Sequence, residues 1–179
     1  MANMTVPELT NLTKEISKED EEFCLFWGGT FSQWAKYDMD IDGVKYNCCE
    51  QYMMAEKARL FDDQEMLEKI MSLKDPREQK KCGRKVKGFD REKWEAIARD
   101  VVYKANYAKF TQNENCLHTL KEQEGKTIVE ASPYDKIWGI GLSKDDPRAK
   151  DKSQWEGTNW LGEAIMQVRD KLIEEKIIV

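Results

Sequence analysis

The sequence lacks any apolar run close to the roughly 20 residues that a membrane-spanning helix needs. Its first 20 residues also lack the basic start and apolar stretch of a signal peptide. These absences predict a protein of the cytoplasm, or of the nucleus in a eukaryote, with no membrane partner. The remaining composition, 40% hydrophobic and 35% charged, is that of an ordinary soluble globular protein.

Histidine is scarce, and the cysteines lack the spacing of metal or redox motifs. His118 is the only histidine, and the five cysteines include no Cys-x-x-Cys spacing. Zinc sites and Cys–His nucleophiles both need such groups close together, so we expect neither a metal nor a cofactor. An odd number of cysteines without a secretion signal predicts reduced thiols.

Positive charge is in deficit as well. The net charge of −5 disfavours general binding to duplex DNA, which draws its affinity from many lysine and arginine contacts to phosphate. One segment departs from this, because residues 80–88 hold five cations among nine residues. Such a segment is typical either of a solvated loop or of a phosphate clamp in which Arg84 and Lys85 supply the charge. The sequence leaves both interpretations open.

Hydrophobic spacing predicts an α+β fold, mostly helical, with a small antiparallel sheet in a single domain over residues 21–179. Residues 1–20 are polar and are expected to form an N-terminal extension. The expected helices cover residues 48–61, 64–71, 76–82, 91–110, 115–124 and 157–174, and the expected strands cover 23–27, a hairpin within 39–46, and 127–129. Regular alternation of strands and helices, the mark of a doubly wound sheet, is absent.

The pair Glu50 and Lys57 is the most informative feature of the chain. Seven residues apart on a predicted helix, they differ by about 20° around its axis and by roughly 10 Å along it. Both fall within an apolar arc that includes Met53, Met54 and Phe61, where charges are rare unless they are paired or line a cleft. A structural ion pair and a cleft wall that carries an acid and an amine are both compatible with this spacing.

Aromatic residues beside glycine suggest where a planar ligand would lie. Trp138 precedes Gly139, and open backbone beside an indole favours stacking on a ring, although a core position is an equal alternative. Asp135 stands just before this pair. A loop aspartate usually forms a turn with its own backbone, but here it is also placed to hold a base, a sugar hydroxyl or water. Trp94 lies on the apolar face of helix 91–110, which favours a core position.

A second aromatic group follows the double glycine at residues 28–29. Phe31, Gln33 and Trp34 supply the rings and the amide that read a heterocycle. None of these signals is specific alone.

Together, these segments resemble consecutive blocks of the NADAR (YbiA-like) family. The blocks are Gly28–Trp34, Tyr46–Phe61, Asp75–Lys80, Gly83–Asp90, Trp94, Tyr103–Asn106 with Lys109 and Phe110, Glu130–Gly141, and Asn159–Gly162. They run in order over about residues 22–174 without large gaps. The Cys48-Cys49 pair departs from the family pattern beside Glu50.

The resemblance implies an N-glycosidase that cleaves ribose from a nitrogen heterocycle. Family members are linked to ribosylamino-pyrimidine phosphates of the riboflavin pathway, to ADP-ribose on guanine bases in DNA, and to NAD and ADP-ribose metabolism. The acidic residue of the family falls on Glu50 and its lysine on Lys57. In that role Glu50 serves as the acid/base and Lys57 as nucleophile or electrostatic partner, while Asp135 positions sugar or water. Trp138 and Trp94 then stack on or wall the base, and Arg84 with Lys85 binds phosphate.

Two other classes of function fit the same residues. A non-catalytic module that binds ADP-ribose or a nucleotide would use the same aromatic and basic side chains. A helical adaptor would hold Glu50 and Lys57 as a buried structural pair. The sequence does not specify which ribosylated base is bound.

Overall fold

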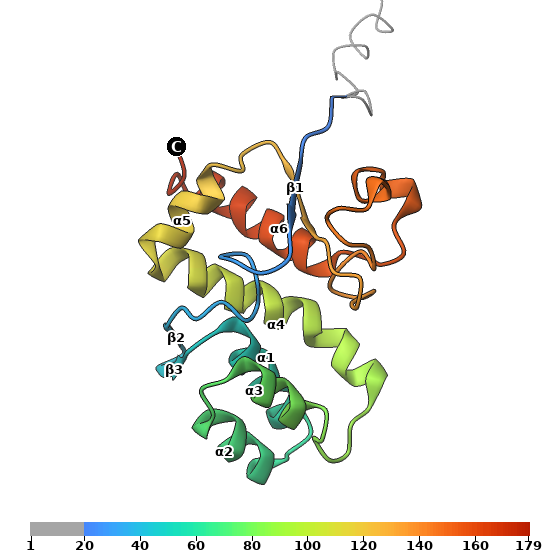
Figure 1. Cartoon of the computed structure of the whole chain (residues 1–179). Coiled ribbons are helices and arrows are strands. Elements are labelled where there is room, and N and C mark those ends of the chain that lie inside the picture. The colour runs from blue at the N-terminus through green and yellow to red at the C-terminus, as the bar shows by residue number, and fades with distance from the viewer. Residues whose placement is uncertain (1–19) are drawn as a thin grey trace, which may run out of the picture.

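The computed structural model describes residues 20–179, and helices make up most of its regular structure (Figure 1). In chain order the elements are β1 (Phe23–Phe26), β2 (Met39–Ile41), β3 (Val44–Tyr46), α1 (Cys49–Leu60), α2 (Gln64–Ser72), α3 (Pro76–Gly83), α4 (Arg91–Gln112), α5 (Glu114–Lys121), β4 (Thr127–Glu130), the 3-10 turns η2 (Pro147–Lys150) and η3 (Lys152–Gln154), and α6 (Trp160–Glu174). The predicted α+β class, mostly helical, is confirmed. The predicted extension lies almost wholly outside the described residues.

Three helices begin at the aspartates that the sequence places before them. The side chains of Asp63, Asp75 and Asp90 accept hydrogen bonds from first-turn N–H groups, at 3.1, 2.8 and 3.1 Å. Each bond satisfies a donor that has no partner within its helix. Helix α3 also has Pro76 in its first turn, where a missing N–H costs nothing.

Helix α6 begins at Trp160, later than the predicted residue 157. Asn159 precedes it with a φ of 54°, a left-handed conformation that cannot continue a helix. The Asn159 amide is used elsewhere: Nδ2 donates to the Ile128 carbonyl at 3.0 Å, and Oδ1 accepts from the Glu130 N–H at 3.0 Å. The start of α6 is therefore tied to the backbone of β4.

Two small sheets complete the described fold. Strands β2 and β3 form the predicted antiparallel hairpin around Gly43. Strands β1 and β4 form a second pair that is parallel, with Phe26 opposite Glu130. The sequence did not predict this pairing. Parallel strands end at the same edge, so the segments that follow Phe26 and Glu130 begin side by side, the position where ligands bind in many open sheets.

Helix α4 lies between α1 on one side and α6 on the other (Figure 1). Its buried residues form a stripe that includes Ala98, Val102, Ala105 and Phe110. Most buried side chains of α1, α4 and α6 belong to one hydrophobic cluster, which orders the helix that carries Glu50. Within residues 20–179, no helix has the length and apolar character needed to cross a membrane.

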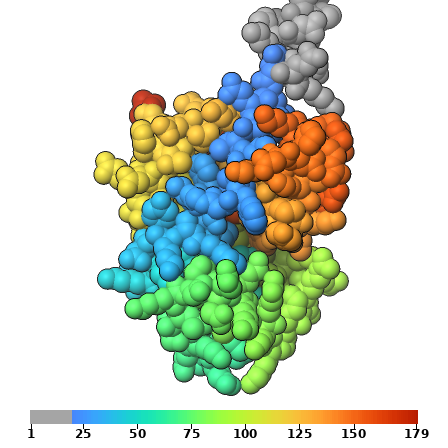
Figure 2. Space-filling model, viewed as in Figure 1, coloured from blue at the N-terminus to red at the C-terminus, as the bar shows by residue number. Residues whose placement is uncertain are grey.

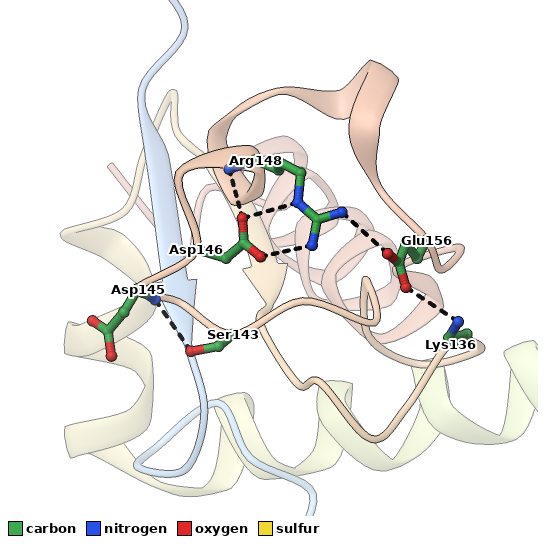
Figure 3. A network of polar contacts seen from close by, with 6 residues as sticks. All are labelled: Lys136, Ser143, Asp145, Asp146, Arg148 and Glu156. Carbon is green, nitrogen blue, oxygen red and sulfur yellow. Dashed lines mark hydrogen bonds and ion pairs between the residues drawn. The ribbon is translucent and has the colours of Figure 1, made fainter.

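Residues 143–156 form a charged surface excursion, and ion pairs connect it to the loop after β4 (Figure 3). Arg148 contacts Asp146 through two nitrogens, at 3.1 and 2.8 Å. The Glu156 carboxylate forms two ion pairs, one with Arg148 at 3.2 Å and one with Lys136 at 3.1 Å. Pairs this exposed add little stability, and the Lys136 loop is also held by its own carbonyl, which accepts from the Thr158 N–H at 3.0 Å.

Candidate active site

A cavity of about 1330 Å³ opens between three parts of the chain. Residues 27–37 after β1 form one wall, residues 130–138 after β4 form another, and side chains of α1 and α3 form the third. Segments from these three regions, blue, orange and green, meet on the face shown in Figure 2. The volume exceeds the roughly 300–1,000 Å³ of most small-molecule sites, so the cavity has room for a nucleotide-sized ligand.

Glu50 lines this cavity from the first turn of α1. Its N–H donates to the Gln33 carbonyl at 3.0 Å, which anchors the helix start to the wall formed by residues 27–37. Its side chain is only 4% exposed. Burial raises the pKa of Glu50 to about 7 and Asp135 adds to the rise, whereas Lys80, Arg84 and Lys57 oppose it. A carboxyl that is half protonated near neutral pH suits proton transfer.

Lys57 is half-buried and is not among the residues that line the cavity. Its amine lies 4.4 Å from the centre of the Phe89 ring. Burial lowers the pKa of Lys57, with Arg84 acting in the same direction and Glu50 in the opposite one. The structure therefore places the lysine within the electrostatic field of Glu50, but outside the cavity wall.

The wall formed by residues 27–37 is held from behind by α4. Lys109 is fully buried, and its Nζ donates to the carbonyls of Thr30 and Ser32 at 2.7 and 3.2 Å. Asn106 donates to the Gln33 side-chain carbonyl at 2.9 Å. Gln33 thereby takes a fixed orientation in the cavity lining, and its contact with ligand stays a prediction.

The opposite wall contributes two more carboxyl groups. Asp135 lines the cavity, and its Oδ1 accepts from the N–H groups of Ile137 and Trp138 at 2.9 and 2.8 Å, so it also forms the turn considered for it. Glu130 lies beside it in the lining. Burial, helped by the charges of Asp135 and Glu50 and opposed by Lys80, raises the pKa of Glu130 to about 7.

Glu130 is a site residue that sequence reasoning did not single out. The available signal was a carboxylate at the end of the apolar strand Thr127–Val129, just before a buried alanine. The parallel pairing of β4 with β1 turns that position into part of the cavity, and this pairing joins segments about a hundred residues apart.

Five aromatic residues line the cavity: Trp27, Trp34, Tyr37, Tyr134 and Trp138. Trp34 and Trp138, which the sequence named as ligand contacts, both lie in the cavity lining. Trp27 and Tyr134, which were not predicted as ligand contacts, are 60% and 84% exposed, with ring centres 6.0 Å apart. They extend from opposite walls, one after each parallel strand. Exposed rings at a cavity mouth offer stacking surfaces to a planar ligand.

Three predicted contact residues lie behind the cavity lining. Phe31 packs against Phe26 and Phe110 in the main hydrophobic cluster. Trp94 is buried in the same cluster, which is the core position that its place on an apolar helix face favoured. Gly139 is also buried. A Cβ at this position would lie 2.8 Å from the Glu130 carbonyl oxygen, so glycine permits the close packing of the wall.

Only part of the basic segment reaches the cavity. Arg84 and Lys80 line it, whereas Lys85 is exposed outside the lining. The N–H groups of Arg84 and Lys85 bond to helix carbonyls, at 3.1 and 2.9 Å. Gly83 is packed against Met54, so it does not open the backbone to an anion. Side chains, not backbone amides, therefore supply the positive charge.

Within residues 20–179, no three histidine, cysteine or acidic side chains gather as metal ligands would. The arrangement is a mostly apolar cavity with three carboxyl groups, four cations (Lys36, Lys80, Arg84 and Lys136) and several aromatic rings. Such a set can bind a planar base attached to a polar sugar, and it can transfer protons near neutral pH.

Comparison with known proteins assigns the family. Residues 13–173 match the model of the NADAR domain, and the chain belongs to this family. N-glycosidase R617 of Acanthamoeba polyphaga mimivirus is 40% identical over 146 residues, which cover 79% of this chain and 86% of the relative. Protein irg-1 of Caenorhabditis elegans is 45% identical over 132 residues, covering 72% of this chain but only 62% of irg-1.

The fold agrees with a solved structure from the same family. The NMR structure of the Escherichia coli protein YbiA superposes with a TM-score of 0.73 at 27% sequence identity, covering 88% of each chain. The curated name of that protein is N-glycosidase YbiA. The resemblance inferred from the sequence blocks is thus confirmed for both family and fold.

Proposed function

We propose that this protein is an N-glycosidase that hydrolyses the C1′–N bond between ribose and a nitrogenous base. The observation that supports this most is Glu50, a buried carboxyl with a pKa near 7 that faces an aromatic-rimmed cavity containing two further acids. The names of R617 and YbiA support the same activity.

The proposed chemistry follows from how the bond breaks. As the C1′–N bond cleaves, its electron pair moves to the base, and positive charge develops on the ribose ring. Protonated Glu50 donates its proton to the departing nitrogen. A water molecule adds to C1′ and passes a proton to a carboxylate. Asp135, on the opposite wall, is the carboxylate that we assign to this step. The products are free base and free ribose, as in glycoside hydrolysis by paired carboxyl groups.

We assign Lys57 the role of electrostatic partner. Because its charge lowers the pKa of Glu50, Lys57→Met should raise that pKa and move the basic limb of the pH–rate profile to higher pH. Exposed Lys69 provides the control, since Lys69→Met should leave the profile unchanged. We expect no adduct when borohydride is added during turnover. A trapped adduct that disappears in Lys57→Met would instead establish an imine on this lysine.

Arg84 should bind a phosphate of the substrate. We expect Arg84→Gln to raise KM for a phosphorylated substrate by about tenfold or more, because a charge-assisted hydrogen bond contributes about 1.5–3 kcal/mol. The neighbouring Lys85→Gln should change KM less than twofold, since Lys85 lies outside the lining. Equal effects of the two substitutions would indicate general attraction by the basic segment, not a clamp.

The substrate we favour is a small ribosylated base, with ribosylamino-pyrimidine phosphates of the riboflavin pathway as the first candidates. The net charge of −5 argues against a large nucleic-acid footprint. ADP-ribosylated guanine in DNA is the second candidate, because the cavity has room beyond one ring and sugar. Parallel incubations with both substrates, followed by chromatography of released base, test the choice directly.

A non-catalytic reader of ADP-ribose is the alternative function. Its support is the exposed pair of rings formed by Trp27 and Tyr134, which would stack on a ligand whether or not it is cleaved. Calorimetric binding of ADP-ribose, with no base released from either ribosylated substrate, would favour the reader over the enzyme.

A further inference from the structure

Two buried polar atoms in the cavity lining have no hydrogen-bond partner within residues 20–179. They are Nε2 of Gln33 and Oε2 of Glu130. Buried polar groups are nearly always satisfied, so an orphan donor and an orphan acceptor in one cavity call for a ligand. The described fold holds both residues in place without using these two atoms.

The backbone of Glu130 is fixed on both sides. Its N–H donates to Asn159 Oδ1 at 3.0 Å, and its carbonyl accepts from the Ile140 N–H at 3.0 Å. Gly139 packs directly against that carbonyl. A side chain carried by such a rigid support is suited to selecting among ligands, because its backbone cannot shift to accommodate a mismatch.

The chemistry of the two atoms indicates which ligand group would bind them. A hydroxyl group is both donor and acceptor, so it satisfies a carboxylate and an amide N–H at once. Carboxylates bind the ribose 2′-hydroxyl in many nucleotide sites. Glu130 also lies within the electrostatic field of Glu50, which acts at C1′ in the proposed function, and the hydroxyl next to C1′ is the 2′-hydroxyl.

We propose that Glu130 accepts a hydrogen bond from the 2′-hydroxyl of the substrate ribose, with Gln33 Nε2 as a donor to the same diol, and that this contact selects ribosides over 2′-deoxyribosides. The inference rests on the proposed function. Hydrogen bonds at this hydroxyl strengthen as charge develops at C1′, so the contact contributes to turnover as well as to binding.

The test compares ribosyl and 2′-deoxyribosyl forms of one base in wild type, Glu130→Ala and Glu130→Gln. We expect Glu130→Ala to lower kcat/KM for the riboside about 100-fold and for the deoxyriboside less than threefold. The ratio of kcat/KM for the riboside to kcat/KM for the deoxyriboside is compared between wild type and the variants, because this cancels the greater intrinsic lability of the deoxyriboside. Glu130→Gln, which keeps the size and an oxygen acceptor, should fall between.

Exposed Glu124→Ala serves as the control and should change neither rate. Equal slowing of both substrates by Glu130→Ala, in protein with a normal unfolding transition, would overturn the 2′-hydroxyl contact. Calorimetric titration with ribose 5-phosphate and 2-deoxyribose 5-phosphate provides a readout without turnover, in which wild type should prefer ribose and Glu130→Ala should not. Absence of base release by wild type would refute the enzyme proposal, whereas equal binding of the two sugars would refute this inference.

Discussion

Replacing Glu50 by glutamine should lower the rate of base release by about 10²–10⁴-fold, the usual contribution of a positioned general acid. Glutamine keeps the shape of the side chain but has no proton of suitable acidity to give. Chromatography of the released base over a range of substrate concentrations provides the measurement. Glu56→Gln on the same helix is the matched control, since Glu56 pairs with Arg59 and does not line the cavity.

The same substitution should make the protein more stable at pH 8. The folded pKa of Glu50, about 7, lies above its ordinary value of 4.5, so the folded chain binds more protons between these two values. The stability that protonated Glu50 contributes is therefore complete below pH 4.5 and is lost as pH rises through 7. At about 1.4 kcal/mol per pH unit, the charged form costs about 3 kcal/mol at pH 8.

Urea unfolding of wild type and Glu50→Gln at several pH values tests this linkage. The variant should exceed wild type by up to about 3 kcal/mol at pH 8, with the difference vanishing near pH 4.5. A variant that is less stable at every pH would mean that the carboxylate is required by the fold. Wild-type turnover in the variant would remove Glu50 from the mechanism.

Lys109→Met should lower the free energy of unfolding by about 2–4 kcal/mol, because two part-buried carbonyls lose their donor. Methionine fills the same space in the interior but cannot bond Thr30 and Ser32. Since these carbonyls belong to the wall that carries Gln33, we also expect a higher KM in the folded protein.

Lys104→Met provides the comparison on the same helix. Lys104 is exposed and pairs with Asp42, a surface contact that contributes at most about 1 kcal/mol. Urea titrations of the two variants should therefore separate clearly. Similar midpoints would show that the Lys109 amine does not hold the wall, and the predicted change in KM would then have no structural basis.

The sequence predicted the helices well because their signals are local. Asp75-Pro76 and Asp90 mark helix starts through contacts within one turn, and the apolar stripe of α4 repeats at helical spacing. Helix geometry likewise placed Glu50 within the apolar arc of α1, where it is buried, but left open whether it lines a cavity.

What the sequence did not predict depends on distant contacts and on the direction of single side chains. Glu130 enters the cavity only because β4 pairs with β1 in parallel, and no local signal encodes that partner. Lys57 shares the helical arc of Glu50, yet its amine lies over the ring of Phe89, a residue distant in the sequence. The core positions of Phe31 and the close packing at Gly139 are likewise set by tertiary contacts.

The parallel pair also has a consequence for synthesis of the chain. In the sequence, helices α1 to α5 lie between its two strands. The wall containing Asp135 therefore emerges from the ribosome long after the wall containing Gln33. Pairing two strands so far apart in the sequence is intrinsically slow. A nascent chain therefore has Glu50 without the opposing acids, and the cavity is complete only once translation has passed β4 and α6 has docked.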